Sequence, residues 1–69
     1  MKVEFYPVGS KVKLESGYMF IGTDTNPSDT EGTVLRTDFC GNFVQHTVNW
    51  SNGVTNGPYK GEDLTYVAQ

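Results

Sequence analysis

The segment that most restricts the fold of this chain runs from Val48 to Val54 and reads Val-Asn-Trp-Ser-Asn-Gly-Val. Apolar and polar residues alternate up to Trp50, and the pair Asn52-Gly53 follows. Asn and Gly both accept positive φ, which a two-residue type I′ hairpin turn requires at both central positions. The segment therefore predicts a strand that carries a large aromatic residue, a tight turn at Asn52-Gly53, and a returning strand over 54–59.

Strand signals recur at short intervals, and no window has the i, i+3, i+4, i+7 spacing of an amphipathic helix. In 11–15, the alternation predicts that Val12 and Leu14 face the core and the charged residues face out. Polar residues fill 23–31, around a turn signal at 26–29, and 38–42 is expected to be a loop or hairpin. The further expected strands are 17–21, 32–37, 43–50 and 64–67.

Five or six short strands joined by Gly- and Asn-rich turns predict an all-β domain. The chain has 69 residues, so we expect one domain over 1–69. At this size a small closed barrel of antiparallel strands is favoured over a sandwich, because closure removes exposed strand edges. In the strand 43–50, one face of the barrel wall is expected to carry Val44, His46, Val48 and Trp50.

The charge balance disfavours nucleic acid as a partner. Eight Asp and Glu residues against five Lys and Arg give a formal net charge of −3. Binding to nucleic acid draws much of its affinity from neutralised phosphates, and a binder usually carries a basic patch. The basic residues Lys2, Lys11 and Lys13 are interleaved with Glu4 and Glu15.

The chain offers little chemistry for catalysis or for metal binding. Cys40 and His46 are its soft ligands, whereas structural zinc takes four. The segment from Asp24 resembles the start of a calcium loop, but Asp29 stands where a glycine is needed and Leu35 where a bidentate glutamate is needed. We therefore expect no catalytic residue, no metal, no cofactor and no enzyme activity.

A single cysteine, no long apolar run, and no basic segment followed by an apolar one predict a cytoplasmic protein without a membrane span. The aromatic content is the more informative feature, at 13% of the residues. A small core holds about four large aromatic rings, so we expect others at the surface. They either anchor a partner or cover the ends of the barrel.

Four segments resemble SH3-like barrels, in the layout of MIB/HERC2-type, KOW and Tudor domains. The chain is also similar to small uncharacterised bacteriophage proteins with an Asn-Pro loop before a Gly-Thr-Val strand. The ending Gly61-Glu62-Asp63-Leu64 departs from the Gly-Tyr-Asp-Leu type of those domains. The segments that carry the resemblance are 7–14 (Pro-Val-Gly-Ser-Lys-Val-Lys-Leu), 31–34 (Glu-Gly-Thr-Val), 48–53 (Val-Asn-Trp-Ser-Asn-Gly), and Tyr59 with 62–64 (Glu-Asp-Leu).

The resemblance implies a binding surface where the long first loop meets the central hairpin. In this chain it would gather Tyr18, Phe20, Asn26 and Tyr59, with Trp50 beside them or buried beneath. The implied function is a non-enzymatic module that binds a protein, with a phage-encoded effector acting on a host protein as the setting. The alternative is a KOW-like binder of single-stranded RNA or DNA, with bases stacked on the exposed aromatic rings.

Overall fold

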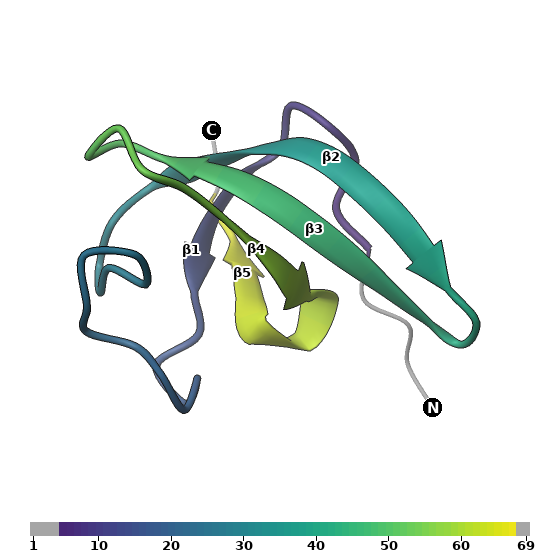
Figure 1. Cartoon of the computed structure of the whole chain (residues 1–69), viewed down its shortest axis with the longest axis horizontal. Coiled ribbons are helices and arrows are strands. Elements are labelled where there is room, and N and C mark those ends of the chain that lie inside the picture. Colours follow the sequence, from purple (N-terminus) through teal and green to yellow (C-terminus); the bar gives the residue numbers. More distant parts are fainter. Residues whose placement is uncertain (1–4, 68–69) are drawn as a thin grey trace.

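The computed structural model describes residues 5–67, which form an all-β fold of five antiparallel strands (Figure 1). The one helical element in this range is the short 3-10 turn η1 (Gly61–Asp63). None of the helical structure in 5–67 is long and apolar enough to cross a membrane. The strands are β1 (Lys11–Leu14), β2 (Gly32–Cys40), β3 (Phe43–Trp50), β4 (Thr55–Lys60) and β5 (Leu64–Tyr66).

The strands form one sheet in the order β4-β3-β2-β1-β5. In Figure 1, β1 and β5 run across the direction of the long β2–β3 hairpin, so the sheet is strongly bent around its core. Within residues 5–67 no pairing joins β4 to β5, and the sheet is open between these two end strands. The turn η1 links them and brings the chain back beside β1.

The core lies on the bent inner face and follows the predicted alternation. Val12 and Leu14 of β1 are buried, and β3 buries every second residue from Val44 to Trp50, as expected. Gly32 lies directly against this core: a Cβ atom there would be 2.5 Å from both the Trp50 ring and the Val48 side chain. The main buried cluster consists of Val12, Leu14, Val34, Val48, Trp50, Tyr59 and Leu64.

The predicted strand 17–21 is wrong. This stretch lies in the long connection 15–31 between β1 and β2 and forms two successive turns. The N–H of Tyr18 donates to the carbonyl of Glu15 at 3.0 Å, and that of Ile21 to the carbonyl of Tyr18 at 3.2 Å. Only Tyr18 and Ile21 pack against the core. An aromatic-rich run resembles a strand in composition, but here it supplies two packing residues from a loop.

The predicted type I′ turn at Asn52-Gly53 is also wrong, although a hairpin is present. Trp50 N–H donates to the Val54 carbonyl at 2.8 Å, which leaves a three-residue loop, and Gly53 N–H donates to the Trp50 carbonyl at 2.9 Å. Gly53 has φ +90°, whereas Asn52 has negative φ. The Asn52 side chain instead accepts the N–H of Val54 at 3.0 Å. A loop with positive φ only at its third residue is a standard three-residue hairpin connection.

The two-residue hairpin lies elsewhere, between β2 and β3. Cys40 pairs with Phe43 across the two residues Gly41 and Asn42. Gly41 has φ +65° and Asn42 has negative φ, as in a turn with glycine at its first central position. β2 therefore extends to Cys40, three residues beyond the predicted end at Thr37.

A bulge in β4 determines which of its residues face the core. His46 pairs with Tyr59 and Val48 with Asn56, so two β4 residues, Gly57 and Pro58, oppose a single residue of β3. Gly57 has φ +149°, and a Cβ atom there would lie 2.8 Å from the His46 carbonyl oxygen. The extra residue places Asn56 and Tyr59 on the same face, although residues three apart in a regular strand face opposite ways.

Candidate aromatic binding surface

Four aromatic rings contact one another in sequence from the surface into the core. We call Phe20, Tyr18, Tyr59 and Trp50 the aromatic row. Ring centroids are 5.8 Å apart for Phe20 and Tyr18, and 5.7 Å for the two following pairs. The interplanar angles are 76°, 72° and 75°, an edge-to-face arrangement that aromatic pairs favour. The structure thus brings together the four aromatic residues that sequence analysis assigned to one surface.

Exposure decreases steadily along the row. Phe20 is 61% exposed, Tyr18 is half-buried, Tyr59 is 1% exposed and Trp50 is fully buried. Trp50 therefore lies beneath the surface, and Tyr59 is a core residue that no partner can contact directly. Met19, which sequence analysis did not select, is 84% exposed beside Phe20. The accessible end of the row consists of Tyr18, Met19 and Phe20.

The Tyr59 hydroxyl has its full set of hydrogen-bond partners. It accepts from the indole Nε1 of Trp50 at 3.2 Å and from Nδ2 of Asn56 at 3.0 Å. It donates its single proton towards Oδ1 of Asn26 at 2.7 Å, with the Thr25 carbonyl 3.0 Å away. A phenol has one donor and two acceptor sites. All three are occupied within the protein, so this hydroxyl is a structural group.

Asn26 fastens the connection 23–31 to the β3–β4 hairpin. Besides Tyr59, its Oδ1 accepts from Nδ2 of Asn56 at 3.1 Å, and the Thr25 carbonyl accepts from the same Nδ2 at 2.8 Å. A third attachment runs from Nδ2 of Asn52 to the carbonyl of Asp24 at 3.1 Å. Sequence analysis placed Asn26 at the binding surface; its contacts hold the loop that adjoins that surface.

The accessible end of the row lies beside negative charge. The carbonyl of Asp63 accepts the N–H of Glu15 at 2.8 Å, and the Glu15 carbonyl accepts the N–H of Tyr18. Desolvation raises the pKa of Tyr18, and the Tyr59 hydroxyl and the Asp63 carboxylate raise it further. Glu15 and Glu62 are exposed nearby along the chain. The accessible end of the row therefore has apolar rings with the Asp63 carboxylate near Tyr18.

Burial also raises the pKa of Tyr59, while the hydrogen bonds from Trp50 and Asn56 act in the opposite direction. Both phenols are thus neutral at neutral pH. A neutral Tyr59 keeps its proton for the bond to Asn26, which a phenolate could not make. The protonation state and the hydrogen-bond pattern are consistent with each other.

His46 is fully buried and connects the segment before β1 to the β3–β4 pair. Its Nε2 lies 3.0 Å from the backbone N of Tyr6, which can only donate, so Nε2 accepts. The ring proton is therefore on Nδ1, which donates to the Tyr59 carbonyl at 3.1 Å. Sequence analysis expected this histidine on the inner face, and it is there. Its partners, forty residues before it and thirteen after it, could not be inferred from the sequence.

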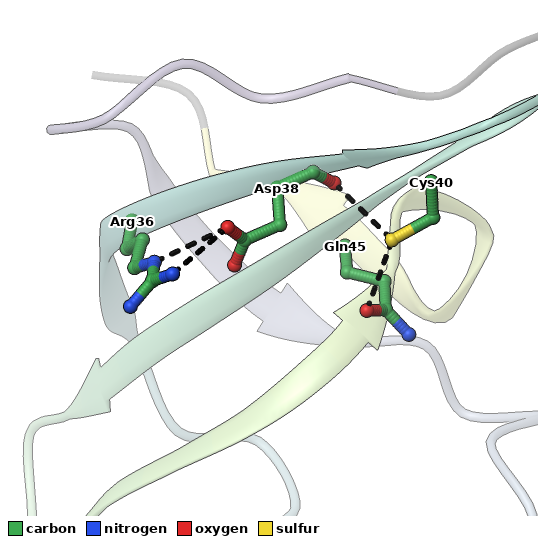
Figure 2. Close-up of polar contacts among 4 residues, drawn as sticks. All are labelled: Arg36, Asp38, Cys40 and Gln45. Carbon is green, nitrogen blue, oxygen red and sulfur yellow. Dashed lines mark hydrogen bonds and ion pairs between the residues drawn. The ribbon is translucent and has the colours of Figure 1, made fainter.

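Cys40 and His46 do not meet. Cys40 lies on the outer face of the β2–β3 hairpin, where its Sγ is 3.3 Å from Oε1 of Gln45 and 3.9 Å from the Asp38 carbonyl (Figure 2). The Arg36 guanidinium binds the Asp38 carboxylate on the same hairpin. Throughout 5–67 no three His, Cys, Asp or Glu side chains are close enough to hold a metal ion.

The outer face of the sheet has a shallow hollow of about 340 Å³. Across it, Nζ of Lys11 donates to the hydroxyl of Thr33 at 2.7 Å, and Nδ2 of Asn49 donates to the hydroxyl of Thr55 at 2.8 Å. The Lys11 ammonium and the Asn49 amide thus each have a hydrogen-bond partner within the protein. The hollow is lined by Lys11, Glu31, Gly32, Thr33, Asn49 and Ser51.

The chain matches no family model, no curated protein and no solved structure.

Proposed function

We propose that this chain is a non-enzymatic protein-interaction module whose binding surface is the accessible end of the aromatic row. The observation that carries the proposal is the change in exposure along the row. Tyr59 and Trp50 are fixed in the core by a saturated hydrogen-bond network, while Phe20 and Met19 project from the surface above them. Aromatic and Met side chains on a rigid base are typical anchors of protein interfaces.

The strand order supports an SH3-like barrel as the scaffold. A long connection after β1, a three-strand meander β2-β3-β4, and a 3-10 turn before a final strand beside β1 follow the order expected of such a barrel. The sequence resemblance alone suggests the setting, which is a bacteriophage protein that contacts a host protein in the cytoplasm. Such barrels carry many unrelated functions, so the surface rather than the scaffold supports the interaction role.

A protein partner is favoured over single-stranded nucleic acid by the charge around the row. The Asp63 carboxylate acts on Tyr18, Glu15 and Glu62 are exposed close to these two residues in the sequence, and carboxylates repel phosphates. The nucleic-acid alternative expects bases stacked on Tyr18, Phe20 or Tyr59, and Tyr59 is buried and cannot stack on a base. Lys2, counted earlier among the basic residues, and Glu4 lie outside the described residues.

The proposal is tested by placing a photo-crosslinking amino acid at position 19 and exposing the protein to a bacterial host lysate. A matched probe at Val8, which is also exposed, reports non-specific capture. We expect the probe at position 19 to form one predominant crosslinked protein, and we expect the probe at position 8 not to form that product. Retention on an oligonucleotide resin at low salt, abolished by added salt, would instead support the nucleic-acid alternative.

A further inference from the structure

The distal half of β2 has a partner on one side only. β1 pairs with β2 at Gly32 and Thr33 alone, and the backbone of Val34 bonds to the N–H of Gly9 and the carbonyl of Ser10. Beyond that point Leu35 falls at a register shift, and residues 36–40 pair with β3 and with no other strand in the described part of the chain. Figure 1 shows this part of the β2–β3 hairpin projecting past the rest of the sheet.

The direction of the backbone groups along this edge follows from the hairpin. Cys40 and Phe43 close a two-residue turn, so their N–H and C=O groups face each other. Antiparallel pairs alternate, which directs Asp38 towards β3 and directs the N–H and C=O groups of Thr37 and Phe39 away from it. Among residues 5–67 nothing accepts or donates a hydrogen bond to those four outward groups.

The two end strands of the sheet, β4 and β5, have features that prevent pairing with another strand, and the free edge of β2 over 36–40 lacks them. β4 carries a bulge and Pro58, which has no N–H, and β5 is only three residues long. Prolines, bulges and short strands are the usual means of preventing edge-to-edge pairing. In β2 the register shift lies before Arg36, and the stretch 36–40 has no bulge and no proline.

The charges on this edge fit a second copy of the same strand. Arg36 and Asp38 lie on either side of Thr37 and project from the same face (Figure 2). Their side chains are 73% and 42% exposed. If two β2 edges pair antiparallel about Thr37, Arg36 of each copy lies opposite Asp38 of the other. Centring the pairing on Asp38 or on Arg36 would oppose like charges, which is destabilising.

We propose that the outer edge of β2 pairs with the same edge of a second copy of this chain, antiparallel about Thr37. The N–H of Thr37 donates to the Thr37 carbonyl of the second copy, and the reverse bond forms by symmetry. Two Arg36–Asp38 contacts flank this central pair and set the register. The result is a two-fold dimer with a continuous sheet through both subunits.

Charge exchange tests the register. In sedimentation equilibrium at concentrations up to about 1 mM, we expect wild-type chain to dimerise reversibly, since the interface is small. R36D and D38R should each raise the dimer dissociation constant about tenfold or more, because each opposes two like-charge pairs. The double variant R36D/D38R restores opposite charges across the dimer and should recover association. A wild-type chain that stays monomeric, or a double variant no better than the singles, would overturn the proposal.

A disulfide tests the symmetry axis directly. In a chain that already carries C40S, T37C places two thiols opposite each other at the axis, with Cα atoms about 5.5 Å apart, within disulfide range. The matched variant F39C/C40S places its thiols several residues apart along the paired strands. We expect rapid interchain oxidation of T37C/C40S and slow oxidation of F39C/C40S. Equal rates would contradict pairing about Thr37, and far-UV CD of the reduced variants checks that both are folded.

Discussion

The hydroxyl oxygen of Tyr59 lies 2.7 Å from Oδ1 of Asn26, which is 33 residues earlier in the chain. This bond joins the core strand β4 to the loop that adjoins the exposed rings of the aromatic row. Because Tyr59 also contacts the rings of Tyr18 and Trp50, one side chain fixes both the loop and the base of the row. The proposed binding surface depends on this buried residue without including it.

Replacing Tyr59 with Phe should lower the free energy of unfolding by about 1–3 kcal/mol, because Trp50, Asn56 and Asn26 each lose a buried partner. Amide exchange should also accelerate over 23–26, where the loop is fastened. Urea denaturation and hydrogen exchange measure the two effects. Tyr66→Phe is the matched control, since Tyr66 is exposed. Equal losses in the two variants would show that the Tyr59 hydroxyl has no special structural role.

Stability should fall at alkaline pH. The folded-state pKa values of Tyr59 and Tyr18 are raised above the ordinary value of 10.0, so the native state retains these phenol protons to higher pH than the unfolded chain. Their contribution to stability is complete below about pH 10 and is lost as pH rises through the folded-state pKa values. Urea midpoints measured at neutral pH and above about pH 10 give the decrease of stability with pH. Tyr59→Phe should make this decrease smaller. A midpoint that rises at alkaline pH would contradict the raised pKa values of the two tyrosines.

Gly53→Val should destabilise the protein by about 1 kcal/mol or more, because Val is strained at positive φ. Gly53 has φ +90°, and a Cβ atom added there would have no neighbour within 4 Å, so the loss reports backbone strain without a steric clash. Gly17→Val is the matched control, since Gly17 also faces open space and its φ lies outside the positive region. Thermal melts of the two variants provide the comparison. Similar melting temperatures would argue against the three-residue hairpin.

His46→Leu should cost about 2–3 kcal/mol, because it leaves the Tyr6 N–H and the Tyr59 carbonyl without their buried partner. The segment before β1 should also lose protection, which amide exchange at Tyr6 would detect. Gln45→Leu, one residue earlier on the outer face, should change stability far less. An unprotected Tyr6 amide in the wild-type protein would contradict the bond to Nε2.

Local patterns predicted the parts of the fold that depend on alternation. The bounds of 43–50 and the inner face from Val44 to Trp50 agree with the structure, because a strand with one buried face shows a period of two. The stretch 17–21 failed, since aromatic content alone does not distinguish a strand from a loop that packs two rings. The Asn52-Gly53 turn failed because the Asn52 side chain bonds the Val54 N–H and leaves positive φ to Gly53 alone.

The sequence predicted which residues form the candidate site, but it did not predict how deeply each of them is buried. Sequence analysis grouped Tyr18, Phe20, Trp50 and Tyr59 by resemblance, and they are in contact. The burial of Tyr59 depends on the bulge at Gly57-Pro58 and on bonds to residues more than thirty positions away. Neither the bulge nor these long-range hydrogen bonds produce a periodic pattern in the sequence. Met19, the most exposed residue of the accessible end, lies in a loop where no pattern distinguishes it.

The most direct test of the interaction role is the affinity of the captured partner for single-residue variants. Phe20→Ala should weaken binding at least tenfold while urea denaturation remains as in the wild type, because Phe20 is 61% exposed and outside the core. Charge reversal at Lys13, on the outer side of β1, should change affinity much less. If Lys13→Glu abolished binding and Phe20→Ala left it unchanged, the exposed end of the aromatic row would not be the binding surface.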